Sequence, residues 1–415
     1  MSSIMLLLEV LSFSNFHGCA LAPDGLTGYV VTLDSIMVLK TTDGGAIWHQ
    51  ISTTASRRFF DVCCTDGEKV WTCGVLGEIM HSRDGGGTWE LQVTGVSKYL
   101  TRIEFLDSLY GWAVGGDGVI ARTRNGGEYW DQYFTPYYLA EYYGVTFADT
   151  LTVYAVAGWP DSCDTGQGYI VKSVDGGENC SSLYQSTGYE DYLDVHAINE
   201  NVIVVVGGND QTLEPIILRS TNGGSTWDSI TAIPENTKYL RALEFIGNKG
   251  WAVGRTGTIL YTEDGGLTWT RQNSPQDSTL FDVDFSDELH GIACGYNHVI
   301  YTLDGGETWN DGVIAGIAEE PNEGPVTLTI KTIFGGNEYT FFLKSRNEYT
   351  VRVSLSLTDI TGRKVKRWED ITFQNEISIS WDGKSDSGSP LPSGIYYLLV
   401  ESEGKLIPAE LLIVN

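Results

Sequence analysis

The sequence predicts an all-β protein: a seven-bladed β-propeller followed by a small β-sandwich. A motif of the form Thr/Ser-x-Asp/Asn-Gly-Gly-x-x-Trp recurs seven times, with successive copies 40 to 50 residues apart. Repetition at this period is typical of propeller blades. The 49 glycines, the 12% aromatic content and the lack of a long helical period favour short strands joined by tight turns. The copies are centred on Asp43, Asp84, Asn125, Asp175, Asn222, Asp264 and Asp304.

The third repeat shows the expected blade most clearly. Leu100–Phe105 alternates apolar and polar residues as a first strand, and Trp112–Gly115 follows as a second strand after a polar turn. Val119–Thr123 is the third strand, Asn125–Gly127 forms the next turn, and Trp130 opens the fourth strand. Four antiparallel strands per repeat make a blade, and seven repeats are expected to close into a ring.

The recurring motif is expected to build the hairpin between the third and fourth strands and to bind nothing. Its Asp or Asn accepts hydrogen bonds from amides of its own turn, and its two glycines permit positive φ. Its tryptophan packs against the neighbouring blade. The fourth repeat has Cys180 instead, so its packing against the next blade is expected to be weaker. The tryptophans at this position are Trp48, Trp89, Trp130, Trp227, Trp269 and Trp309.

These repeats carry a resemblance to a known family over about residues 16–309. They look like Asp boxes, also called bacterial neuraminidase repeats. The string from Gly250-Trp-Ala-Val-Gly254 to Asp264-Gly-Gly-Leu-Thr-Trp269 resembles the propeller family of photosystem II assembly and stability factors and its many bacterial relatives. The resemblance implies the propeller fold, and it also implies an assembly factor that holds a membrane-protein partner.

A change in composition marks a domain boundary after the last repeat. We assign residues 1–311 to the propeller, the stretch 312–326, rich in Glu, Asn, Gly and Pro, to a linker, and residues 327–415 to a second domain. In that domain Val351–Leu357 and Ile377–Trp381 alternate as strands of a β-sandwich do.

The second domain contains three short motifs that carry a further resemblance. They are Asp359-x-x-Gly362-Arg363, Trp381-Asp-Gly383 and Ser393-Gly-Ile-Tyr396. With them the domain resembles the immunoglobulin-like domain of flagellar hook-capping proteins, and equally the C-terminal sorting domain of type IX secretion cargo. This resemblance implies export across the outer membrane, with secretion or surface-attachment machinery as a partner. The final Leu412–Asn415 lacks the basic residue of the cargo pattern.

Charge and hydropathy narrow the range of partners. The net charge is −28, and residues 1–322 hold 42 of the 54 Asp and Glu but only 16 Lys and Arg. Such an acidic array repels phosphate backbones, so nucleic acid is not an expected partner.

No stretch is long enough to span a bilayer. The apolar start Met1–Leu11 lacks the basic region of a signal peptide, so the expected extracellular or cell-surface location rests on the second domain.

The seven cysteines form no recognisable disulfide framework. Cys63, Cys64, Cys73 and Cys294 fall in predicted strands, where a free thiol is a small apolar filler. Cys163 and Cys180 would lie at opposite ends of one strand, about 16 Å apart, which is too far for a bridge.

The sequence shows no pattern of a metal, cofactor or catalytic site. It has no Cys-x-x-Cys or His-x-x-x-His spacing, and no glycine-rich turn that opens a helix for a phosphate. Asp-box propellers include sialidases, which use three arginines, a Tyr–Glu pair and an Asp acid. Their Arg-Ile-Pro string is absent here, and seven blades are expected instead of six. Xyloglucanase-type enzymes need a cleft between two propellers, whereas one propeller fits this chain.

Loop lengths give a candidate recognition site. We call the face with the Asp-box hairpins the bottom; connections between second and third strands, and between blades, then lie on the top. Gly158–Gly168 and Gly207–Pro215 are unusually long, and Tyr133–Tyr143 is rich in aromatic residues. These segments are expected to converge on the top face, where aromatic rings suit a protein or glycan; the alternative is that they pack on themselves. The candidate contacts are Tyr137, Tyr138, Trp159, Asp161, Asp164, Asn209 and Asp210.

Charged residues on first strands define a second candidate, in the central channel. Asp61, Arg102, Asp194 and Asp282 occupy equivalent positions and are expected to point toward it. Two interpretations compete, a weak site for a cation or polar ligand and an ordinary solvated lining of the channel.

The sequence thus favours a non-enzymatic binding or scaffold protein that is secreted or held at the cell surface. It would recognise a protein or glycan on the top face of the propeller. A glycoside hydrolase of sialidase or xyloglucanase type and an assembly factor for a membrane-protein complex stay open as alternatives.

Overall fold

The computed structural model of this chain forms two compact units, residues 13–313 and the chain from residue 314 onward, and each is described by itself. Four of the candidate contacts, Tyr138, Trp159, Asp161 and Asp164, lie outside the described residues, as does Cys163. The described residues are 15–33, 36–51, 53–55, 57–137, 139–158, 167–315, 326–329, 339–345, 351–359, 364–374, 376–391, 394–402 and 405–414.

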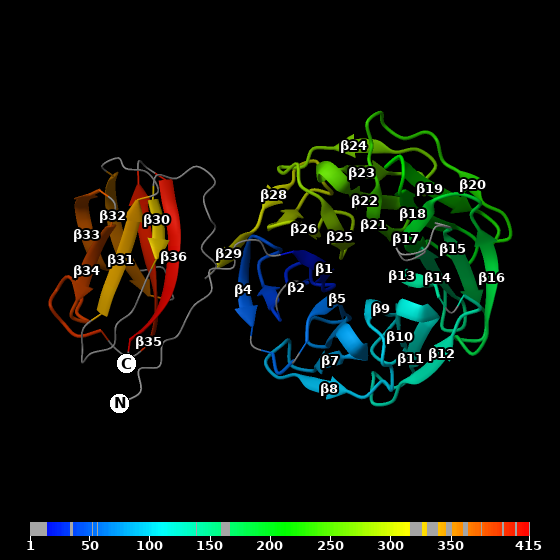
Figure 1. Ribbon diagram of the computed structural model, residues 1–415, viewed down its shortest axis with the longest axis horizontal. Helices are drawn as coiled ribbons and strands as arrows, with labels where there is room; N and C mark the ends of the chain where they lie inside the picture. Colours follow the sequence, from blue (N-terminus) through cyan, green and yellow to red (C-terminus); the bar gives the residue numbers. More distant parts are fainter. Residues whose placement is uncertain are drawn as a thin grey trace. The chain divides into compact units, whose positions relative to one another are not determined.

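The described part of the first unit is a seven-bladed β-propeller, as the repeats predict. Seven antiparallel sheets of four consecutive strands surround a central axis, with the first strand of each blade on the inside (Figure 1). The first four blades are β1–β4 (Phe16–Leu21, Gly28–Thr32, Val38–Thr41, Ile47–Ile51), β5–β8 (Phe59–Cys64, Val70–Gly74, Ile79–Ser82, Glu90–Gln92), β9–β12 (Leu100–Phe105, Gly111–Gly115, Val119–Thr123, Asp131–Phe134) and β13–β16 (Glu141–Phe147, Val153–Gly158, Tyr169–Ser173, Cys180–Gln185). The last three are β17–β20 (Glu190–Ala197, Ile203–Asn209, Pro215–Ser220, Asp228–Ser229), β21–β24 (Leu240–Ile246, Lys249–Gly254, Ile259–Thr262, Thr270–Gln272) and β25–β28 (Leu280–Phe285, Gly291–Gly295, His298–Thr302, Asn310–Asp311).

Several connections between second and third strands are single 3₁₀ turns on the top face. Their middle residue has positive φ, as at Thr256 (55°), and a glycine follows. At Gly77 a side chain is excluded, because φ is 71° and a Cβ atom would lie 2.3 Å from the carbonyl oxygen of Val96. These turns are η1 (Val75–Gly77), η2 (Gly116–Gly118) and η3 (Arg255–Gly257).

Aromatic side chains fill the interfaces between blades. Trp71 of β6 stacks on Phe105 of β9, with ring centroids 3.8 Å apart, and Trp130 meets the same Phe105 edge-on. The Nε1 of Trp130 donates to Gln92 of the preceding blade at 3.0 Å. The Asp-box tryptophan therefore packs toward the preceding blade. The expectation for Cys180 is corrected accordingly, since it packs in the cluster shared with Trp112 of the preceding blade and not against the next one.

The Asp-box hairpins cap themselves. In blade six the Asp264 Oδ1 accepts hydrogen bonds from the amides of Leu267 and Thr268, at 3.0 and 2.9 Å, and from the hydroxyl of Thr262 at 2.8 Å. In blade two, hydrogen bonds from Thr88 lower the pKa of Asp84 to about 2, so this carboxylate stays ionised throughout the neutral range.

The same hairpins dock each blade onto the one before it. The carbonyl oxygen of the first Asp-box glycine accepts a hydrogen bond from a side chain of the preceding blade. Lys40 donates to Gly85 at 2.7 Å, and Trp251 Nε1 donates to Gly305 at 3.0 Å. The carbonyl oxygen of the glycine thus gains a hydrogen-bond donor. The same bond holds the Asp-box turn against the preceding blade.

Within the described residues, the first and last blades close the ring by packing, by an isolated β-bridge between Asn15 and Tyr296, and by a strand after the last blade that pairs with the first. Every strand of the last blade comes from residues 280–311, and β1 packs beside β25 (Figure 1). A further strand, β29 (Val313–Ala315), joins the outer edge of the first blade, where the Val313 amide donates to Ala46 at 2.8 Å. From its sequence, Leu6–Phe13 could add a strand to the last blade or stand apart; this segment lies outside the described residues.

The second unit contains two antiparallel sheets in its described residues, with strand orders β30-β31-β34 and β33-β32-β35-β36. Val353, Leu355 and Leu357 of β32 are buried, which matches the alternation of the sequence. The strands are β30 (Val326–Thr329), β31 (Tyr339–Ser345), β32 (Val351–Asp359), β33 (Lys364–Phe373), β34 (Glu376–Trp381), β35 (Gly394–Ser402) and β36 (Lys405–Val414).

Candidate functional site

A buried charge cluster lies at the centre of the propeller. The guanidinium of Arg102, from β9, reaches carboxylates of three other blades: Asp282 at 2.7 Å, Asp194 at 3.5 Å and Asp61 at 3.6 Å. The three aspartates are 2 to 3% exposed. The sequence predicts that these four residues share one level of the channel. It does not predict that the single arginine serves as counter-cation for all three carboxylates.

Each of these aspartates also joins neighbouring blades. Asp61 accepts the amide of Ile103 at 2.8 Å, Asp194 that of Leu243 at 3.0 Å, and Asp282 that of Cys19 at 2.9 Å. Every acceptor is one blade before its donor in the ring. Because Arg102 already occupies the position that a bound cation would take, the geometry favours a structural lining over a cation site.

A cavity of about 460 Å³ lies on the top side of this cluster. Its walls are the starts of first strands, which is the end that faces the top, together with residues of connections on the same face. Aromatic and charged side chains dominate the lining. They are Phe60, Tyr99, Tyr143, Tyr239, Phe281, His17, Glu141, Asp191, Asp210, Arg241 and Arg255, with Asp61, Arg102 and Asp194 at the base.

Two arginines of this cavity have no ion pair among the described residues. Arg241 lies over the ring of Phe281, 5.1 Å from its centroid, and Arg255 lies over Tyr239 at 5.3 Å. The Nε of Arg241 is buried and has no hydrogen-bond partner within the described part of the chain. Burial lowers the pKa of Arg241, although a guanidinium remains charged at neutral pH. Two unmatched positive charges in an otherwise acidic propeller are suited to an anionic group.

Two acids of the cavity, Glu141 and Asp191, are held by tyrosines instead. Tyr99 and Tyr143 both donate to Glu141, the latter at 2.9 Å, and Tyr239 donates to Asp191 at 3.2 Å. Burial raises the pKa of all three phenols, so they remain protonated donors. Glu141 and Asp191 therefore have hydrogen-bond donors other than Arg241 and Arg255.

The predicted contact residues are only partly brought together. Asp210 lines the top cavity. Asn209 instead caps its own loop by accepting the amides of Gln211 and Thr212 at 3.0 Å. Tyr137 lies against its own blade, with its ring 4.0 Å from that of Tyr169 and its hydroxyl donating to Ser182.

Sequence reasoning missed Glu141, Tyr239, Arg241 and Arg255 as cavity residues. Glu141, Tyr239 and Arg241 lie at or next to the start of a first strand, close to the position that Arg102 has in its own first strand. This position in the repeat could have identified them. Loop length, which guided the choice of candidates, does not report which side chains end beside the channel.

A smaller cavity of about 260 Å³ lies on the bottom side of the cluster, lined by Glu104, His196, Glu244 and Asp284. His196 and Glu244 approach to 3.6 Å. Burial raises the pKa of Glu104 to about 8 and that of Asp284 to about 7. Both acids are therefore partly ionised at neutral pH, and this ionisation lowers the stability of the folded state.

Replacing Glu104 by glutamine is expected to make the protein less sensitive to alkaline pH. Because the folded pKa is raised, the stability linked to this group is fully present below its unfolded pKa and is lost as pH rises through about 8. The stability gained by E104Q should grow by about 3 kcal/mol between pH 5.5 and 8.5 in urea unfolding. The exposed Glu128, changed to Gln, should give no such trend; a pH-independent effect of E104Q would contradict the assignment.

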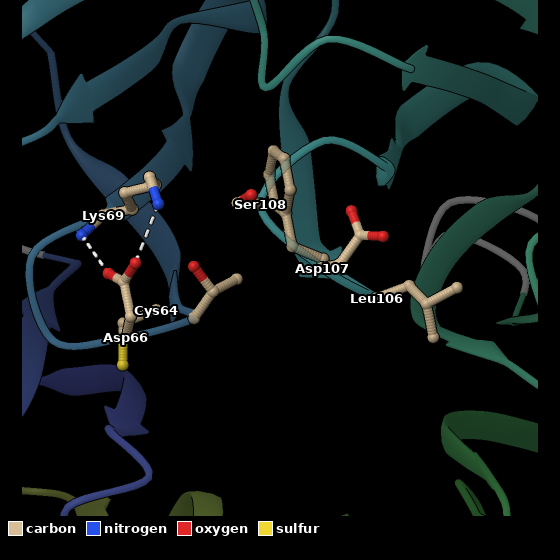
Figure 2. A pocket seen from close by; sticks show the side chains of 8 residues that line it. Cys64, Asp66, Lys69, Leu106, Asp107 and Ser108 are labelled. Carbon is tan, nitrogen blue, oxygen red and sulfur yellow. Dashed lines mark hydrogen bonds and ion pairs between the residues drawn. The ribbon is translucent and has the colours of Figure 1, made fainter.

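A hollow of about 440 Å³ on the bottom face lies between the turns of blades two and three (Figure 2). Its charged groups are already matched. Asp66 pairs with Lys69 at 2.8 Å, as Figure 2 shows, and Asp107 accepts the amides of Leu109 and Tyr110. Since its polar groups are occupied in turn caps, this hollow is a gap between neighbouring turns and offers little to a ligand.

Within the described residues, no group of three or more His, Cys, Asp or Glu has the arrangement of a metal site. One feature of a sialidase, the Tyr–Glu pair, has a counterpart here, because Tyr99 donates a hydrogen bond to Glu141. The arginine clamp of a sialidase is incomplete, however, because Arg102 is held by three aspartates. No helix in the described part of the chain is long and apolar enough to cross a membrane.

Comparison with known proteins places the repeats close to one family. The family model described as photosynthesis system II assembly factor YCF48 matches residues 50–124 and 182–276. A photosystem II assembly lipoprotein Ycf48 of Synechococcus sp. (strain CC9902) is 28% identical over 127 residues, which is 29% of this chain and 36% of the relative. The chloroplastic photosystem II stability/assembly factor HCF136 of Arabidopsis thaliana is 38% identical over 68 residues, 15% of this chain and 16% of the relative. The matched regions thus span about a third or less of these relatives.

Solved structures share the propeller architecture at low sequence identity. A structure of YCF48 bound to D1 peptide has a TM-score of 0.56 at 17% identity and covers 70% of this chain and 93% of its own. YCF48 from Cyanidioschyzon merolae has a TM-score of 0.54 at 18% identity, covering 70% and 95%. Kuenenia stuttgartiensis hydrazine synthase has a TM-score of 0.58 at 12% identity, covering 74% and 100%. Because a hydrazine synthase superposes as well as YCF48 bound to a peptide does, these similarities establish the fold alone.

Proposed function

We propose that this chain is a non-enzymatic binding propeller that captures a segment of a partner protein in the top cavity, in the manner of an assembly factor for a membrane-protein complex. The observation that carries the proposal is the pair of unmatched arginines, Arg241 and Arg255, in a cavity walled by aromatic rings. The matching family model consists of photosystem II assembly factors, and one structure of similar fold is a complex with a peptide.

The preferred ligand is an extended peptide segment with a carboxylate. Arginines that lie over aromatic rings give a planar, fork-shaped donor set for a carboxylate, while the rings cover apolar parts of the segment. The cluster at Arg102 closes the base of the cavity, so the ligand is held at the channel mouth and does not thread through the ring.

We propose further that residues 327–415 form an immunoglobulin-like domain that sorts the protein for export or attaches it at the cell surface. The support comes from the three motifs of the sequence and from the antiparallel sheets of the second unit. The propeller would then act outside the cell, on a partner at the membrane surface.

A peptide array tests the binding function. The full chain is applied to overlapping peptides from the membrane proteins of its own organism, and affinities of bound peptides are measured by fluorescence polarisation. The double variant R241Q/R255Q is expected to lose at least about tenfold in affinity, because both ligand-facing charges are removed. The matched control R83Q/R124Q removes two exposed arginines of the Asp-box hairpins and should leave affinity unchanged.

Three outcomes would contradict the proposal: equal binding by the two double variants, binding to a glycan array with no peptide bound, or cleavage of a fluorogenic sialoside by the wild-type protein. The second would support a glycan ligand, and the third would support the hydrolase alternative. Circular dichroism of each variant verifies that a loss of affinity does not reflect unfolding.

A further inference from the structure

Each first strand of the propeller carries a β-bulge at the same level, close to its start at the top face. In blade two, Phe59 pairs with Gly74 and Asp61 pairs with Cys73, so Phe60 is an inserted residue without a cross-strand neighbour. The same one-residue shift occurs in the first strand of every blade. The inserted residues of blades one to seven are His17, Phe60, Thr101, Tyr143, Leu193, Arg241 and Phe281.

The bulge turns one side chain of each blade toward the mouth of the channel. A regular strand sends successive side chains to opposite faces of the sheet, whereas an inserted residue interrupts this alternation. Phe60 and Asp61 therefore both line the top cavity, as do Leu193 and Asp194. All seven inserted residues line this cavity, and each is partly exposed although the residue before it is buried. We call these seven residues the bulge ring.

The bulge ring presents one charge, the guanidinium of Arg241, and otherwise mainly apolar surface. The hydroxyls of Thr101 and Tyr143 are already engaged, as donors to a backbone carbonyl and to a carboxylate. The Nδ1 of His17 donates to the carbonyl oxygen of Phe60 at 2.8 Å, and burial lowers the pKa of this imidazole, so it is neutral at neutral pH. A ligand at the mouth of the channel therefore meets aromatic and aliphatic side chains beside a single cation.

Three aromatic members of the bulge ring form a continuous arc next to this cation. His17 stacks on Phe281, with ring centroids 5.5 Å apart and an angle of 20° between the ring planes. On its other side His17 meets Phe60 edge-on, with centroids 5.8 Å apart. Arg241 lies over Phe281, 5.1 Å from its centroid, so the guanidinium adjoins one end of the arc. A carboxylate bound at Arg241 would thus lie close to a flat apolar surface.

We propose that the bulge ring determines the specificity of the top cavity, which selects a peptide segment whose acidic residue has an aromatic residue one or two positions away. This inference rests on the proposed function, in which Arg241 and Arg255 bind the carboxylate. Aromatic rings pack on one another in stacked or edge-on geometry, so a ligand ring can extend the arc in the way that its members already meet. Successive residues of an extended segment are about 3.4 Å apart, so a ring at this offset reaches Phe281 or His17 while the carboxylate stays at Arg241.

Synthetic peptides test this selection. The full chain is titrated against the fluorescein-labelled peptide Ser-Gly-Ser-Ser-Glu-Ser-Ser-Gly-Ser and against copies in which one serine is replaced by Phe or by Leu. Fluorescence polarisation is expected to show that wild-type protein binds a peptide with Phe within two residues of the glutamate at least about tenfold more tightly than the parent peptide. Leu at the same place should give a smaller gain, and Phe in place of either terminal serine should also give less. Replacement of the glutamate by glutamine should abolish the binding of the Phe peptide.

Variants of the protein assign the effect to the arc. F60A/F281A truncates both ends of the arc and should bind the Phe peptide no better than the parent peptide, whereas R241Q/R255Q should weaken the binding of both. The matched control Y129A/F134A removes two aromatic side chains that are 65% and 63% exposed and do not line the cavity, and it should bind as wild type does.

The outcomes separate this inference from the function on which it rests. Binding that needs the glutamate and the two arginines, but gains nothing from Phe or gains equally from Leu, would overturn the aromatic selection and leave the proposed function standing. Equal losses in F60A/F281A and Y129A/F134A would also overturn it. Binding that does not need the glutamate, or no binding of any peptide, would overturn both. The comparison of peptides uses wild-type protein, so it decides even if F60A/F281A does not fold.

Discussion

Replacement of Arg102 by methionine is expected to lower the free energy of unfolding by about 3–5 kcal/mol at pH 7.5. The variant keeps the length of the side chain but leaves Asp61, Asp194 and Asp282 buried together without their counter-charge. Removal of one partner from a buried ion cluster costs more than the cluster contributes as a whole, because the remaining charges are uncompensated. The three affected carboxylates come from three blades, so the loss should appear in the cooperative unfolding of the propeller.

The effect of R102M should shrink at acidic pH. Burial already raises the pKa of Asp61 to about 7 and that of Asp194 to about 6 in the wild-type protein, and loss of the guanidinium raises them further. Since the folded pKa values are raised, the protonated carboxyls favour the folded state, and this contribution is lost as pH rises through about 6 to 7. Urea unfolding at pH 5.5 and 7.5 measures the difference.

Arg124 provides the control for this experiment. It is exposed and pairs with Glu178 at 3.0 Å on the surface, so R124M should cost at most about 0.5 kcal/mol at either pH. A loss for R102M that is as small as the control, or the same at both pH values, would show that the cluster does not hold the blades by charge.

Replacement of Trp48 by alanine is expected to cost about 3–5 kcal/mol and to weaken closure of the ring. The indole is fully buried, and its Nε1 donates to the carbonyl oxygen of Gly45 at 2.8 Å. It packs directly against Gly312, where an added Cβ would lie 2.8 Å from the indole nitrogen. Gly312 follows the last strand of the last blade, so the cavity left by W48A opens at the seam between the first and last blades.

Trp227 is the matched control, because it occupies the same Asp-box position in blade five. It is only partly buried, and its indole nitrogen has no hydrogen-bond partner among the described residues. W227A should therefore cost about 1–2 kcal/mol. Urea unfolding of both variants gives the comparison, and limited proteolysis shows where the chain opens first. If W227A is the more damaging substitution, the seam is not the weak interface of the ring.

The sequence by itself determined the blades. An Asp or Asn, two glycines and a tryptophan at fixed offsets specify a capped hairpin through interactions within a few residues, such as Asp264 with Thr268. Since each copy acts locally, its recurrence was enough to give the number of blades and the positions of their strands. Strand alternation likewise placed Asp61, Arg102, Asp194 and Asp282 on one level of the channel, because equivalent residues of repeated units lie at equivalent heights.

Only the tertiary structure determines which charged side chains of the channel and the top cavity have a partner of opposite charge. Arg102 is shared by three aspartates, whereas Arg241 and Arg255 lie over aromatic rings and form no ion pair with any residue that the structure describes. The aspartates that face Arg102 come from positions tens to nearly two hundred residues away, and the hydrogen bond from the Cys19 amide to Asp282 joins the first and last blades. Such pairings depend on how seven sheets close around one axis. Sequence offsets record local geometry, but they do not record the distances across a channel that exists only after the ring has closed.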